Sequence, residues 1–143
     1  MKLFLDANII FTAAYSAEGI SRGLFRLATA GKCLLCTSAF AHEEAARNIQ
    51  KKAPDKLPEL TRLMPQVAIL PEPHPRWVAW AAGLPLARKD APILAAAIQG
   101  KVDILLTGDR RDFGCLFGQV LEGVTISTPA EAVEAIICKL HTF

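Results

Sequence analysis

The chain has 143 residues, of which 52% are hydrophobic and 21% are charged, and its formal net charge at neutral pH is +2. This length and apolar content predict one domain, residues 1–143, with a substantial hydrophobic core. The nearly balanced charge excludes a protein that attracts nucleic acid through a strong overall positive field. The apolar runs are far shorter than a membrane span, so we expect no membrane association.

Apolar runs with strand character alternate with helical patterns along the chain. The expected strands cover residues 2–6, 33–38, 66–70, 102–107 and 124–128. The expected helices cover residues 8–15, 19–31, 38–52, 55–64, 90–100 and 129 onward, with shorter helical pieces around 77–80 and 113–117. We find no hairpin signal between the strands. The alternation therefore predicts an α/β fold, a sandwich of three layers (α/β/α) with a central parallel sheet.

The four cysteines do not have the spacing of a disulfide framework or of a paired zinc site. Cys33 and Cys36 form a C-x-x-C pair. Residues three apart in a strand point to opposite faces, so these two thiols are not expected to bind one metal ion. Buried structural thiols suit a reducing compartment, and we expect a cytoplasmic protein. Asp6 also interrupts the N-terminal apolar run before it reaches the length of a secretory signal.

Acidic side chains stand where the expected strands end. Asp6 closes the first strand, and Asp109 follows the strand at 102–107. The carboxyl ends of parallel strands meet at one rim of the sheet, where open α/β sheets bind ligands. Asp103 begins its strand and lies about 15 Å from that rim, so it is excluded. Further acids expected at the rim are Glu43, Glu44, Asp90 and Asp112.

Each of these residues has a structural explanation when it is taken alone. Asp90 and Asn8 have the character of helix caps, and Asp109 suits a turn after Gly108. Their convergence favours a different interpretation, because several carboxylates at one rim repel one another. A carboxylate cluster without His or Cys partners has the ligand chemistry of Mg²⁺ or Mn²⁺.

Four motifs, in this order along the chain, carry a resemblance to a known family. They are LFLDANII, TSAFAHEEAARNI, KDAPILAAA and DILLTGDRRDFG. Together they resemble the PIN domain family of metal-dependent nucleases. Its members are three-layer α/β/α folds whose acidic cluster binds Mg²⁺ or Mn²⁺ and cuts RNA. The proline-rich stretch 53–89 does not match the family pattern.

The resemblance implies a role for each matching residue. The catalytic and metal-binding residues would be Asp6, Glu44, Asp90 and Asp109, with Asp112 as a fifth metal ligand and Asn8 and Thr107 in support. The bound cations would activate a water and offset charge on the phosphate. The basic residues beside the acids, which suit contacts to flanking phosphates or equally a solvated surface, are Arg88, Lys89, Arg110 and Arg111.

The sequence therefore predicts a Mg²⁺- or Mn²⁺-dependent endoribonuclease whose partner is RNA. The small size resembles the toxin half of VapBC-type toxin–antitoxin pairs, which implies a cognate antitoxin and a homodimer. Two alternatives stay open, namely a PIN-fold RNA-binding module without strong catalysis and an acid-cluster phosphohydrolase. A haloacid-dehalogenase-like phosphotransferase is disfavoured, because Asn8 stands where that class has its second acid.

Overall fold

A six-stranded sheet with the strand order β3-β2-β1-β4-β6-β5 forms the middle layer of the protein. The structure is a computed structural model and describes residues 1–108 and 113–140. Its strands are β1 (Lys2–Leu5), β2 (Leu34–Ser38), β3 (Val67–Leu70), β4 (Ile104–Leu106), β5 (Val120–Leu121) and β6 (Val124–Ser127). Strands β3, β2, β1, β4 and β6 pair in parallel, so their carboxyl ends share one rim.

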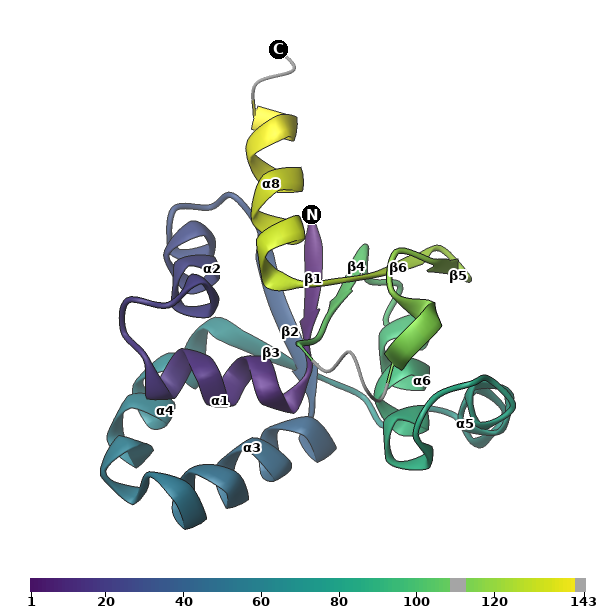
Figure 1. Ribbon diagram of the computed structural model, residues 1–143, viewed down its shortest axis with the longest axis horizontal. Helices are drawn as coiled ribbons and strands as arrows, with labels where there is room; N and C mark the ends of the chain where they lie inside the picture. Colours follow the sequence, from purple (N-terminus) through teal and green to yellow (C-terminus); the bar gives the residue numbers. More distant parts are fainter. Residues whose placement is uncertain (109–112, 141–143) are drawn as a thin grey trace.

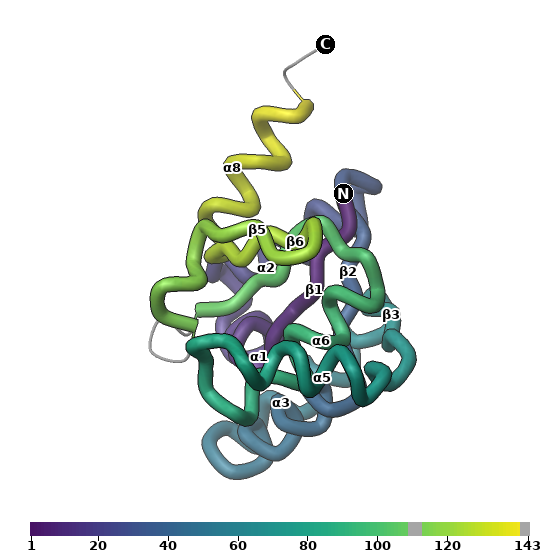
Figure 2. Tube along the Cα trace, turned by 90° about the vertical axis from the view of Figure 1, so that its right-hand side faces the viewer, coloured from purple at the N-terminus to yellow at the C-terminus, as the bar shows by residue number. Residues whose placement is uncertain are grey.

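Helices cover both faces of the sheet, as Figures 1 and 2 show. Helices α1 to α4 lie on one side, and α5 and α6 lie on the other (Figure 1). The helices are α1 (Ala7–Tyr15), α2 (Ile20–Thr29), α3 (Ala39–Lys52), α4 (Leu57–Leu63), α5 (Pro75–Ala82), α6 (Ala91–Gln99) and α8 (Pro129–Leu140). The predicted α/β fold with helices on both sides of a mostly parallel sheet is confirmed.

The expectation of a sheet without hairpins is wrong at one edge. Strands β5 and β6 pair antiparallel, and Glu122 and Gly123 connect them. These two residues have φ angles of 50° and 85°, the left-handed values that a two-residue type I′ turn requires. The sequence reading found only the strand at 124–128, because β5 has two residues and is too short to show an alternating pattern.

The C-terminal end of α2 illustrates how local sequence sets the boundary of a helix. Gly31 has a φ of 76°, a conformation that glycine adopts without a steric penalty. Its N–H donates to Ala28 O at 2.9 Å, and the N–H of Lys32 donates to Leu27 O at 2.9 Å. This pair of bonds is a Schellman motif, which satisfies carbonyls left open at a helix C-terminus. The predicted end near Gly31 thus agrees with the structure to within two residues.

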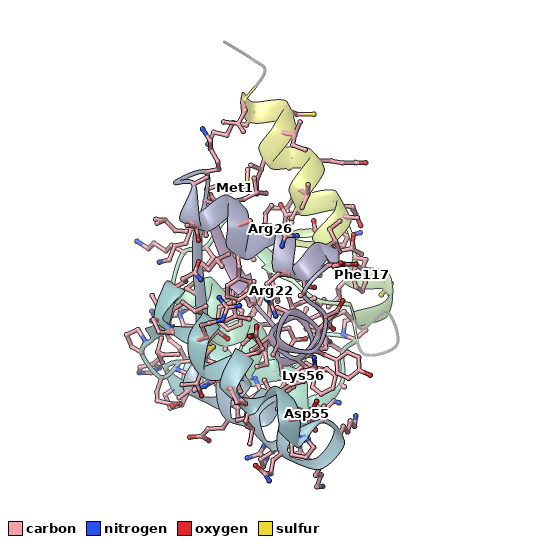
Figure 3. The ribbon with its side chains drawn as sticks, turned by 90° about the vertical axis from the view of Figure 1, so that its left-hand side faces the viewer. Met1, Arg22, Arg26, Asp55, Lys56 and Phe117 are labelled. Atoms are coloured by element: carbon pink, nitrogen blue, oxygen red, sulfur yellow. The ribbon has the colours of Figure 1, made fainter. Side chains whose placement is uncertain are left out.

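A charged cluster joins α2 to α4. Arg22 is only 7% exposed, and its side chain donates to Ala13 O at 2.7 Å and pairs with Glu59 at 3.0 Å. Arg62 also pairs with Glu59, at 2.8 Å. The hydrogen bond from Arg62, followed by the positive charges of both arginines, lowers the pKa of Glu59 below its usual value. Figure 3 shows Arg22 and Arg26 along α2 on this side of the molecule.

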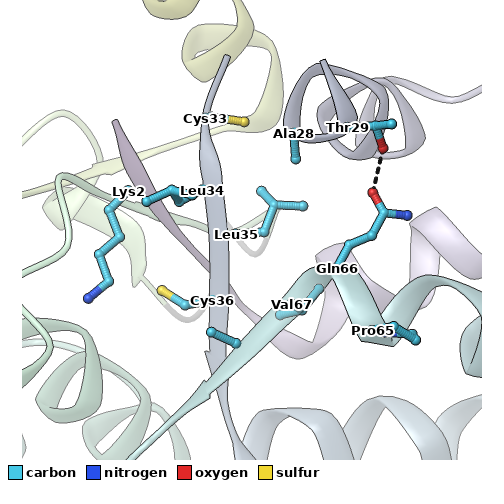
Figure 4. Close-up of a pocket in the computed structure, with 11 residues that line it drawn as sticks. Lys2, Ala28, Thr29, Cys33, Leu34, Leu35, Cys36, Pro65, Gln66 and Val67 are labelled. Carbon is cyan, nitrogen blue, oxygen red and sulfur yellow. Dashed lines mark hydrogen bonds between the residues drawn. The ribbon is translucent and has the colours of Figure 1, made fainter. Parts of the chain in front are cut away.

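Cys33 and Cys36 are both buried and point to opposite sides of the chain at β2, as Figure 4 shows. The Sγ atoms contact different carbonyls, Leu24 O at 3.9 Å and Leu3 O at 3.4 Å. Burial raises the pKa of both thiols, and that of Cys36 to about 11. The two thiols are therefore protonated packing groups at neutral pH.

The core is continuous from the sheet into α6, where every residue from Ile93 to Ile98 is buried. Four of the nine α6 residues are alanines, and their small side chains let the helix approach the sheet closely. Within residues 1–108 and 113–140, no helix is long and apolar enough to cross a bilayer.

Candidate metal centre

Asp6 follows β1 at the carboxyl rim of the sheet and is only 4% exposed. Its Oδ1 accepts a hydrogen bond from the N–H of Ala7 at 2.7 Å, which makes Asp6 the N-cap of α1. Its Oδ2 accepts from the hydroxyl of Thr107 at 2.9 Å, and Thr107 follows the neighbouring strand β4. These two bonds compensate part of the cost of burying the carboxylate and hold it in one orientation.

Asn8 connects this carboxylate to the residues that follow β4. Its Oδ1 accepts from the N–H of Gly108 at 3.0 Å. Its Nδ2 lies 3.4 Å from Thr107 Oγ1 and 3.5 Å from Asp6 Oδ2. Asn8 therefore connects the first turn of α1 to the residues that follow β4, next to Asp6.

A pocket of about 110 Å³ opens beside Asp6. Glu44 reaches it from α3, and Asp90 reaches it from the start of α6. Asp90 is only 6% exposed. The complete lining consists of Asp6, Ala7, Asn8, Glu44, Asn48, Lys89 and Asp90. Three of the four acids predicted to be catalytic thus come from three distant segments and share one small polar pocket.

The structure distinguishes between the two neighbouring glutamates of α3. Glu44 is half-buried and lines the pocket, whereas Glu43 is exposed and does not. The sequence reasoning missed Asn48, which lies one turn after Glu44 and lines the same pocket. The spacing of four residues, which places two side chains on one helix face, is the signal that would have found it.

The remaining predicted site residues fall in several places. Lys89 lines the acidic pocket, and Arg88 lines a separate pocket next to it. Asp103 lies at the opposite end of the sheet, where it accepts from the N–H of Lys2 at 2.7 Å, in agreement with its exclusion. The predicted site residues Asp109, Arg110, Arg111 and Asp112 lie outside the described residues.

The pocket has the composition of a site for a hard divalent cation. Three carboxylates and one ammonium give its lining a formal charge of −2 when all four groups are ionised. Its protein donors are carboxylate and amide oxygens, which Mg²⁺ and Mn²⁺ prefer. In the described part of the chain, no three acidic, His or Cys side chains come close enough to hold a metal ion directly. Mg²⁺ commonly binds through one or two carboxylates and keeps several waters, so the residues present fit such an ion.

The fold and the acidic pocket at its carboxyl rim define an α/β protein with a polar site between the end of β1, helix α3 and the start of α6. The PIN domain family model matches residues 2–111, and the chain belongs to this family. The matched range includes residues 53–89, so the expectation that this stretch lies outside the family pattern is wrong. No curated protein sequence matches the chain significantly.

Solved structures share this fold at low sequence identity. VapBC2 from Rickettsia felis, bound to a DNA fragment from its promoter, has a TM-score of 0.66 and 16% identity, over 90% of this chain and 98% of that one. PAE2754 from Pyrobaculum aerophilum has a TM-score of 0.62 and 18% identity, over 96% of this chain and 99% of that one. FitAB bound to the IR36 DNA fragment has a TM-score of 0.56 and 18% identity, over 89% and 94%. At these identities the likeness concerns the fold.

Proposed function

We propose that this chain is a metal-dependent endoribonuclease that hydrolyses RNA phosphodiester bonds with Mg²⁺ or Mn²⁺. The observation that carries the proposal is the acidic pocket, in which Asp6, Glu44 and Asp90 meet at the rim of a parallel sheet. Membership of the PIN domain family supports it, because members of this family are typically nucleases that bind metal.

In this proposal Asp6, Glu44, Asp90 and Asp109, with Asp112 as a further acid, would hold the metal, one or two of them directly and the others through its bound waters. A bound divalent cation supplies an activated water and stabilises charge that develops on the phosphate. Ala7 N–H and the Thr107 hydroxyl hold the Asp6 carboxylate in place. Asn48 lines the pocket, and its amide would hydrogen-bond water there.

The basic residues would receive the substrate. Lys89 lines the acidic pocket and would bind the phosphate at the site of cleavage. Arg88 is exposed in the neighbouring pocket and would bind the next phosphate along the strand. Arg110 and Arg111 complete the proposed set of phosphate contacts.

The similar structures VapBC2 and FitAB support a proposal about the biological role. We propose that the chain is the toxin of a type II toxin–antitoxin pair and acts in the cytoplasm. It would bind a cognate antitoxin and form a homodimer, with residues 1–143 as a single catalytic domain.

The decisive experiment compares the purified wild-type protein with Asp6→Asn on a panel of single-stranded and structured RNAs. Asparagine keeps the side-chain size and the ability to cap α1, so the fold is retained while the pocket loses one negative charge. We expect wild type to cut RNA in Mn²⁺ and not in EDTA, and we expect Asp6→Asn to be at least about 100-fold slower.

Asp103→Asn is the matched control, because it makes the same chemical change at the opposite end of the sheet and should cut at the wild-type rate. Melting curves without metal should show that Asp6→Asn is folded. Cleavage by Asp6→Asn at the wild-type rate would refute the proposal, and so would an unfolded variant. Tight RNA binding without cleavage by wild type would instead identify a binding module, and cleavage of small phosphomonoesters alone would identify a phosphohydrolase.

A further inference from the structure

A second, larger pocket of about 700 Å³ opens at the same rim, beyond the ends of β2 and β3. Ser38, the last residue of β2, and Glu72, which follows β3, lie at its edge. Helix α5 and the first residues of α6 form its walls. Neither the metal ligands nor the residues around Asp6 belong to it, and the proposed function uses only Arg88 of its lining residues.

One short turn separates the two pockets. Lys89 and Asp90 line the acidic pocket, whereas Arg88, Ala91 and Pro92 line the larger one. Adjacent residues of the chain have Cα atoms about 3.8 Å apart, so the two pockets are neighbours on the scale of a single nucleotide. A strand whose phosphate lies beside Asp90 would therefore carry its next base to the larger pocket.

The walls of the larger pocket have the chemistry that suits a base. They are mostly apolar and include Val78 and Ala79 of α5 and the ring of Pro75. Phe40, in the first turn of α3, is 38% exposed and offers an aromatic surface for stacking. Arg88 and Glu72 supply charged hydrogen-bonding groups at the edge. The volume lies in the range of pockets that bind small organic ligands.

We propose that this pocket, which we call the base pocket, holds one unpaired nucleobase of the RNA adjacent to the cleaved phosphate. The proposal rests on the proposed nuclease function and deepens it by assigning a base-binding subsite, because an unstacked base can enter a pocket that a base within a duplex cannot reach. The closeness of the acidic pocket, across the turn at 88–92, and the positive charge of Arg88 favour a nucleotide over an apolar peptide. The enzyme would consequently show a preference for the base at one position beside the cleaved phosphate.

The test combines a change in the pocket with a change in the RNA. Ala79→Leu places a larger side chain into the base pocket from an exposed helical position. Ala130→Leu, an exposed helical position on α8 outside the base pocket, is the matched control. A set of short single-stranded RNAs, each lacking the base at one position, identifies which base enters the protein. Steady-state cleavage in Mn²⁺ gives KM and kcat for each combination of protein variant and RNA.

Binding is measured separately from cleavage, in Ca²⁺, by tryptophan fluorescence. The two tryptophans of the chain, Trp77 and Trp80, both lie on α5 and report on this wall of the base pocket. Stacking of a base typically contributes enough free energy for about a tenfold change in affinity. We expect one base-free position to weaken binding and raise KM about tenfold in wild type and in Ala130→Leu.

Ala79→Leu should show the same loss with intact RNA and no additional loss with base-free RNA, because both changes remove one interaction. Two results would overturn the base pocket and leave the nuclease function standing. One is wild-type cleavage that is equally sensitive to the missing base at every position, and the other is cleavage of intact RNA by Ala79→Leu at the wild-type rate. Loss of a protein partner in Ala79→Leu with unchanged RNA cleavage would overturn the base pocket as well. Absence of both RNA binding and cleavage in wild type would overturn both proposals.

Discussion

Asp6 both caps helix α1 and lines the acidic pocket, and its hydrogen bonds serve both tasks. A buried carboxylate is costly unless it is paired or hydrogen-bonded. The N–H of Ala7 donates to Oδ1, and the hydroxyl of Thr107, which follows the neighbouring strand β4, donates to Oδ2. Thr107 is fully buried, so its hydroxyl is shielded from competing water. We infer that Thr107 positions the Asp6 carboxylate, which we propose as a metal ligand.

Replacing Thr107 with valine tests this positioning role. The change keeps the shape and removes the bond to Asp6 Oδ2, so we expect unfolding in urea to show a loss of about 1–3 kcal/mol. We also expect Mn²⁺ affinity, measured by calorimetry, to fall about tenfold because the ligand is less well oriented.

Thr37→Val is the control for that measurement. Thr37 is equally buried, and its hydroxyl donates to Leu5 O at 2.7 Å; neither residue lines the acidic pocket. It should lose similar stability and keep its Mn²⁺ affinity. Equal loss of Mn²⁺ affinity in both variants would mean that Thr107 acts only through general stability.

At the scale of elements, the site depends on where helices start relative to the strands. Helix α1 begins directly at the end of β1, and α3 begins directly after β2 with Ser38 as its cap. Ala41, Ala45 and Ile49 form the buried stripe of α3. This stripe fixes the rotation of the helix and leaves Glu44 at the pocket, while Glu43, about 100° away around the helix, faces solvent.

The two glutamates therefore provide a matched pair for mutagenesis. We expect Glu44→Gln to reduce Mn²⁺-dependent RNA cleavage by about tenfold or more, because the pocket loses a charged ligand. Glu43→Gln should stay within about twofold of wild type, since its side chain is solvated. The reverse result, with Glu43→Gln inactive and Glu44→Gln active, would show that our ligand assignment on α3 is wrong.

At the scale of the whole molecule, the parallel sheet brings acids from distant parts of the chain to one rim. Asp6 and Asp90 are both nearly buried and share a pocket with Glu44. Like charges in such a space oppose folding, and a divalent cation relieves that repulsion. Because the unfolded chain does not assemble this pocket, metal binding should stabilise the folded state.

Thermal melts in EDTA and in millimolar Mn²⁺ measure this coupling. At a metal concentration about 100 times the dissociation constant, binding adds about 2.7 kcal/mol. For a chain of this size that corresponds to a rise of several degrees in the melting temperature. Asp6→Asn should lose most of the rise, and Asp103→Asn should keep it. Identical melting temperatures of the wild type in EDTA and in Mn²⁺ would argue strongly against a metal site.

Much of this architecture could be predicted from local patterns. The strand and helix alternation, the cap at Ser38 and the glycine after α2 depend on residues close together in sequence, so one sequence is enough to find them. The antiparallel strand β5 was not predicted, because a two-residue strand is too short to show a periodic pattern. The residues Asp6, Glu44 and Asp90 could be chosen in advance because parallel strands place their carboxyl ends at one rim.

The sequence by itself determined the order of the elements, the family motifs and the types of side chain that meet at the rim. Only the tertiary structure decided which of the adjacent residues in the turn at 88–92 line which pocket. Lys89 lines the acidic pocket, and Arg88 lines the base pocket. It also added Asn48 to the acidic pocket. The physical reason is that local periodicity fixes which face a residue occupies, whereas the partner of that face depends on packing between segments far apart in the chain.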